Sequence, residues 1–158
     1  MKTAVIFYSL DGNCALAAEE IKTQLNADMI RLQTKDEKKR SGFAKFFWGG
    51  GMVFLHRKPP LKPYTFDPAA YDLIIIGAPI WAASPAPPIK TFLSETNITG
   101  KKIALFVCQA GSNEGALDKF KSMLPGNEIV AAIDFISPAN SGGEELKLKV
   151  AEWLKGFI

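Results

Sequence analysis

The chain has 158 residues, of which 47% are hydrophobic and 22% charged, and its formal net charge is +3. This length and composition suit one sizeable core and exclude a low-complexity chain, so we expect a single domain over residues 1–158. No apolar run approaches the roughly 20 residues of a membrane-spanning helix, and no signal-peptide pattern follows Met1.

Apolar runs alternate with amphipathic segments along the whole chain. Strands are predicted over 3–8, 73–76, 103–108 and 129–136, where Val, Ile and Phe are frequent, and a short strand is predicted over 28–32, after the first helix. Helices are predicted over 15–25, 88–94, 114–124 and 144–157. The run over 73–76 lacks polar alternation, which is typical of a strand buried on both faces, and we expect Gly77 to end it. The alternation predicts an α/β fold, a doubly wound sheet of about five parallel strands.

The segment between the first strand and the first helix is a candidate phosphate site. Small and polar residues there allow the backbone to wrap an anion, and the helix amino terminus offers unpaired N–H groups. The sequence matches neither the dinucleotide fingerprint G-x-G-x-x-G nor a Walker A loop. An ordinary strand-to-helix turn would explain the same residues. The candidates are Ser9, Leu10, Asp11, Gly12, Asn13 and Cys14.

Two further segments follow strands at the edge of the sheet where open α/β folds bind ligands. Four prolines between 79 and 88 predict an extended, stiff loop, on which Trp81 offers a flat face for stacking on an aromatic ligand. A core or surface-capping role for Trp81 is the alternative. The candidates after the third strand are Pro79, Ile80, Trp81, Ala82, Ala83 and Ser84, and those after the fourth are Cys108, Gln109, Ala110, Gly111, Ser112 and Asn113.

These three segments resemble the flavodoxin family. Its phosphate loop, Thr/Ser-x-Thr-Gly-Asn-Thr, is matched at Ser9, Gly12 and Asn13, whereas Asp11 and Cys14 depart from it. Residues 71–93 are similar to the family's third strand, first flavin-flanking loop and third helix, and 107–115 are more weakly similar to its second flavin-flanking loop. The resemblance implies a short-chain flavodoxin-like fold with strand order 2-1-3-4-5. It also implies FMN, with the phosphate in the 9–14 loop and the isoalloxazine ring between the other two segments.

The departures from the family raise two questions about binding. The Asp11 carboxylate would oppose a phosphate, unless the side chain turns outward or caps the following helix. The segment 35–62 carries eight basic residues against two acidic ones, although family members are typically acidic. We interpret this segment either as a solvated cover of the sheet or as a docking surface for an acidic redox partner. A membrane or a nucleic acid is a less favoured partner.

The two cysteines are predicted to be free thiols in a cytoplasmic protein. If one strand separates their elements, Cys14 and Cys108 lie on the order of 10 Å apart, which is beyond disulfide reach. No cysteine and histidine spacing suits a metal, and no residue set resembles a catalytic acid and base.

We therefore expect an FMN-binding electron-transfer flavoprotein that shuttles electrons between redox partners. The first alternative is an NAD(P)H-dependent quinone or FMN reductase on the same fold, although no nicotinamide site is recognisable. The second alternative is a flavin-free interaction module, in which Asp11 disables the phosphate site.

Overall fold

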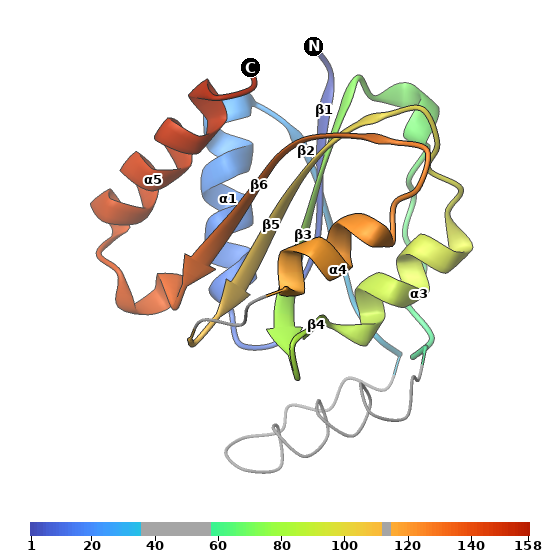
Figure 1. Ribbon diagram of the computed structural model, residues 1–158, viewed down its shortest axis with the longest axis horizontal. Helices are drawn as coiled ribbons and strands as arrows, with labels where there is room; N and C mark the ends of the chain where they lie inside the picture. The colour runs from blue at the N-terminus through green and yellow to red at the C-terminus, as the bar shows by residue number, and fades with distance from the viewer. Residues whose placement is uncertain (36–57, 112–114) are drawn as a thin grey trace.

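A computed structural model describes residues 1–35, 58–111 and 115–158 of the chain. Five parallel strands form its sheet in the order β2-β1-β3-β5-β6 (Figure 1). Their bounds are Thr3–Tyr8 for β1, Asp28–Leu32 for β2, Leu73–Trp81 for β3, Lys102–Gln109 for β5 and Glu128–Ile136 for β6. The parallel, doubly wound sheet predicted from the apolar runs is confirmed.

A sixth strand lies off this path and was not predicted. β4 (Ser84–Pro85) pairs antiparallel with the end of β3, so that Trp81 lies opposite Ser84. The predicted order 2-1-3-4-5 therefore holds for the parallel strands, while the full sheet contains this additional two-residue strand.

Within the described residues, two helices cover each face of the sheet. α1 (Asn13–Leu25) and α5 (Gly143–Lys155) pack on one face, and α3 (Pro87–Glu95) and α4 (Ala116–Ser122) pack on the other (Figure 1). Alternate residues of β3 enter the two cores: Ile74 and Ile76 face α3 and α4, while Leu73 and Ile75 face α1 and α5. This arrangement explains why the run has no polar alternation. In the described residues, no helix is both long and apolar enough to cross a membrane.

The expectation that Gly77 ends the third strand is wrong. β3 continues through Gly77 to Trp81, and Gly77 pairs with Phe7 of β1 and Phe106 of β5. A Cβ atom at Gly77 would lie 1.9 Å from Cζ of Phe106, so the Phe106 ring occupies the space above this glycine. Gly77 is required for packing and not for a turn, because no side chain fits beneath that ring.

The strands β1, β3 and β5 end at the same edge of the sheet (Figure 1). The 9–14 segment follows β1, whereas the other two candidate segments begin within the last residues of β3 and β5, so the topology brings the predicted site residues to one edge. The basic segment begins nearby, and its two ends are joined by an antiparallel bridge between Thr34 and Leu61. Most of the predicted docking segment 35–62 lies outside the described residues.

Candidate functional site

The loop before α1 is organised around the hydroxyl of Ser9. The Ser9 side chain is buried, and its Oγ accepts hydrogen bonds from the backbone N–H groups of Gly12 at 3.1 Å and Ala15 at 3.3 Å. Gly12 has a φ of 97°, a left-handed conformation that favours glycine. Two N–H groups therefore already point to one oxygen atom inside the loop. These contacts hold the loop in shape at the amino terminus of α1, and that position is what fits the predicted anion chemistry.

Asp11 contacts the backbone at the start of α1, so its carboxylate lies within the candidate phosphate loop. Its Oδ1 accepts a hydrogen bond from the N–H of Asn13 at 3.2 Å. The Asn13 Oδ1 in turn accepts one from the N–H of Ala139 at 2.9 Å, which ties the loop to the segment after β6. The Asp11 carboxylate thus holds an N–H group at the start of α1, where it would compete with a phosphate oxygen.

Arg31 is a residue of this site that the sequence interpretation missed. It lies on the edge strand β2, and its Nη2 donates a hydrogen bond to the carbonyl oxygen of Ser9 at 3.0 Å. The guanidinium therefore brings a positive charge to the loop, opposite in sign to that of Asp11. Its position near the end of β2 was the only signal in the sequence, because the contact depends on the pairing of β2 with β1.

The segment after Gly77 is a hairpin and not an irregular loop. Its turn consists of Ala82 and Ala83, whose φ values are 47° and 55°. Such left-handed angles in non-glycine residues cost on the order of 1–2 kcal/mol each. Trp81 is partly buried before the turn and contacts the buried Tyr8 edge to face, with ring centroids 5.8 Å apart. Strain of this kind is typical of functional sites, and the pairing of Trp81 with Ser84 across the turn holds Trp81 at this edge of the sheet.

The end of β5 contributes to a partly buried polar pair. Gln109 Nε2 donates a hydrogen bond to Oδ2 of Asp134 on β6, and the N–H of Ser137 donates to the Gln109 carbonyl at 2.8 Å. Burial raises the pKa of the Asp134 carboxyl, while Gln109 and Lys149 lower it. Asp134 was missed because only the strand register brings it beside the Gln109 strand. Of the other candidates, Ala110 and Gly111 are exposed, and Ser112 and Asn113 lie outside the described residues.

The expected separation of the two cysteines is wrong. Cys14 and Cys108 are both buried in the core beneath α1, close enough for Cys108 to affect the pKa of the Cys14 thiol. The expected distance was based on one strand lying between the two elements. Cys14, however, lies on α1, which packs over the face of the sheet, so the number of intervening strands does not give the distance between the thiols. Burial raises the pKa of the Cys14 thiol well above its usual range, and the contact with Cys108 raises it further.

The raised pKa predicts slow modification of Cys14. A higher pKa lowers the thiolate fraction at neutral pH, and burial excludes the reagent, so native protein should react with 5,5′-dithiobis(2-nitrobenzoate) at least tenfold more slowly than unfolded protein. The rate measured on a Cys108→Ala variant, which leaves Cys14 as the only thiol, should rise as pH increases from 7 to 9. Equal rates for native and unfolded protein at pH 7 would contradict this expectation.

The assembled site can bind an anion next to an aromatic surface. The Ser9 loop supplies N–H donors and one guanidinium, and the Trp81 hairpin and the Gln109 strand end at the same sheet edge. No group of acidic, histidine or cysteine residues among those described could hold a metal ion. Cofactor binding through phosphate and ring contacts is therefore the chemistry that these residues favour.

Comparisons with known proteins agree with this geometry. The chain is similar in structure to a flavoprotein in complex with FMN from Lactobacillus acidophilus NCFM, with 22% identity, coverage of 97% of this chain and 98% of that one, and a TM-score of 0.75. It is also similar to a putative flavoprotein from Bacteroides eggerthii, with 19% identity, coverage of 97% and 98%, and a TM-score of 0.77.

A third similar structure is oxidised flavodoxin 2 from Bacillus cereus, with 20% identity, coverage of 99% and 100%, and a TM-score of 0.62. No curated protein matches the chain. The family model described as flavodoxin matches residues 2–132, which is most of the chain. The chain therefore belongs to the flavodoxin family.

Proposed function

We propose that this protein binds FMN and transfers electrons between redox partners. The observation that carries the proposal is the Ser9 loop at the amino terminus of α1, whose shape the Ser9 hydroxyl fixes by accepting the Gly12 and Ala15 N–H groups. The phosphate would be held there, at the amino terminus of α1, with the Arg31 guanidinium nearby. The FMN complex of the Lactobacillus flavoprotein supports the choice of ligand.

The flavin ring would lie between the Trp81 hairpin and the segment after β5. FMN supplies the redox chemistry, since it can accept and donate electrons, and the protein holds it. Trp81 is held by its pairing with Ser84 and by its contact with Tyr8, so its indole would pack against the ring at little entropic cost. Residues 108–113 would border the other side of the ring.

The proposed redox partner of this carrier is an acidic protein. The basic residues of 35–62 would attract an acidic protein, and the described ends of the segment include Lys35, Lys58 and Lys62. Charge-reversal at Lys38, Lys39 and Arg40 should then slow electron exchange with an acidic partner at low salt, with a smaller difference at high salt.

The binding proposal is tested by calorimetric titration of the apoprotein with FMN and with riboflavin. We expect stoichiometric binding of FMN and much weaker binding of riboflavin, because only FMN carries the phosphate. Trp81→Ala should weaken FMN binding by roughly 0.5–1.5 kcal/mol plus the lost burial, whereas Trp153→Phe, on α5, should leave it unchanged.

Two results would contradict the proposal. Absence of saturable FMN binding at micromolar concentrations would leave a flavin-free module as the better interpretation. Equal affinity for FMN and riboflavin would show that the Ser9 loop does not bind the phosphate. Turnover of NAD(P)H with a quinone would favour a reductase over a carrier without affecting the binding proposal.

A further inference from the structure

A hollow lies between α3 and α4, and of the candidate cofactor residues only Ser84 is among its described lining residues. Its volume is about 440 Å³, and the hairpin strand β4 contributes to it. The two helices lie side by side on the face of the sheet opposite α1 (Figure 1). The lining residues are Lys58, Ser84, Lys90, Leu93, Ser94, Lys119 and Met123.

Three lysines line this hollow, namely Lys58, Lys90 and Lys119. Among the described residues that line it, none is an aspartate or a glutamate. Among the ion pairs of the described residues, none includes these three lysines. Burial lowers the pKa of the Lys90 ammonium, and the nearby charge of Lys119 lowers it further. The hollow therefore has a positive potential, and a bound anion would reduce the repulsion between these ammonium groups.

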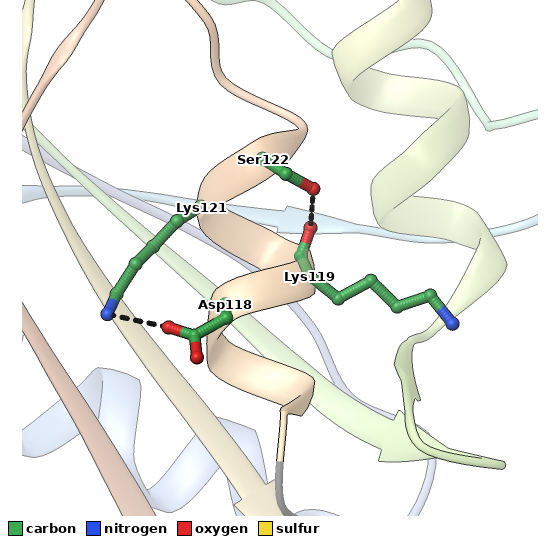
Figure 2. A network of polar contacts seen from close by, with 4 residues as sticks. All are labelled: Asp118, Lys119, Lys121 and Ser122. Carbon is green, nitrogen blue, oxygen red and sulfur yellow. Dashed lines mark hydrogen bonds and ion pairs between the residues drawn. The ribbon is translucent and has the colours of Figure 1, made fainter.

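The lysines of α4 are divided between its two sides. Lys121 Nζ pairs with Asp118 Oδ1 at 3.1 Å, whereas the Lys119 side chain extends away from this pair and toward α3 (Figure 2). Lys119 and Lys121 thus differ in environment although they lie two residues apart on the same short helix. This difference supplies a matched control for any effect of charge.

Ser84 is an independent indication of a ligand. Its side chain is 0% exposed and lines the hollow, and its Oγ has no hydrogen-bond partner among the described residues. Buried hydroxyl groups are normally hydrogen-bonded, so this one is available to a polar group that enters. Leu93 and Met123 add an apolar wall next to these polar groups.

We propose that the hollow between α3 and α4 binds a small amphipathic organic anion. Its carboxylate, sulfonate or phosphate group lies among the ammonium groups of Lys58, Lys90 and Lys119, with the Ser84 hydroxyl at the base. Its apolar part packs on Leu93 and Met123. This site is separate from the Ser9 loop, which lies at the start of α1, but it shares the hairpin that carries Trp81. The inference does not depend on FMN binding.

The test is a titration with naphthalene-2-sulfonate followed by ¹H–¹⁵N NMR, in the presence and absence of saturating FMN. We expect saturable shifts in the amides of Ser84, Lys90 and Leu93, with the neutral analogue naphthalene-2-sulfonamide binding more weakly. Lys119→Met and Lys90→Met should each weaken binding by roughly three- to tenfold, and Ser84→Ala by a smaller factor. The control Lys121→Met should change the affinity by less than twofold.

Three outcomes would overturn the proposal. The first is an absence of saturable shifts at millimolar probe. The second is equal weakening by Lys119→Met and Lys121→Met, which would indicate unspecific attraction to surface charge. The third is a set of shifts that centre on residues 9–14 and disappear with FMN, which would place the probe in the flavin site. Persistence of the Ser84 and Lys90 shifts with FMN bound supports a separate site, and their presence in a protein that does not bind FMN supports it equally.

Discussion

Gly77→Ala should lower the free energy of unfolding by about 1–3 kcal/mol, because the added methyl group would overlap the Phe106 ring. The ring cannot easily move, since it lies in the core and contacts Phe135 edge to face with centroids 6.2 Å apart. For a domain of this size the melting temperature should fall by several degrees. Denaturant unfolding followed by circular dichroism measures both quantities.

A matched control and a second background make this test specific. At Gly143 a Cβ atom would meet nothing within 4 Å, so Gly143→Ala should change stability by no more than about 0.5 kcal/mol. In a Phe106→Leu background, the smaller side chain leaves room for the methyl group, and Gly77→Ala should then cost less than it does in the wild type. An equal cost in both backgrounds would show that the loss comes from the backbone and not from the Phe106 ring.

The sheet could be predicted because its signals are local. Four of the five parallel strands correspond to runs rich in Val, Ile and Phe, while β2 is the short segment after the first helix, and each amphipathic run became a helix that buries its apolar stripe. Gly77 was misinterpreted for the opposite reason, since its role depends on an aromatic ring 29 positions later in the sequence. Glycine occurs in many turns, and only the tertiary structure shows that Gly77 instead leaves room for the Phe106 ring.

The candidate site was predictable in position and less so in its contacts. The loops at the strand ends follow from the fold, which places Ser9, Trp81 and Gln109 at one sheet edge. Arg31 and Asp134 were missed because strand pairing brings them to this edge, and no motif marks either residue. The contact between Cys14 and Cys108 was missed because it depends on where α1 lies over the sheet. Pairwise contacts between distant segments therefore account for most of what the sequence did not show.

The opposite charges of Asp11 and Arg31 predict opposite changes in FMN affinity. Asp11→Asn removes a negative charge and keeps an oxygen that can accept the Asn13 N–H, so binding should tighten. Arg31→Met removes the positive charge next to the Ser9 carbonyl, so binding should weaken. Charges a few ångströms apart near water interact by about 1 kcal/mol, which corresponds to a roughly fivefold change in each direction.

Calorimetry with FMN and riboflavin separates charge from loop structure in these variants. Riboflavin has no phosphate, so its affinity should not respond to either substitution, and both differences for FMN should shrink as KCl rises. Asp11→Ala removes the hydrogen bond to Asn13 as well as the charge, so it should gain less affinity than Asp11→Asn. If Asp11→Asn instead weakens FMN binding, the carboxylate stabilises the binding conformation of the loop more than its charge opposes the phosphate. An unchanged affinity in Arg31→Met would place the phosphate beyond the reach of the guanidinium.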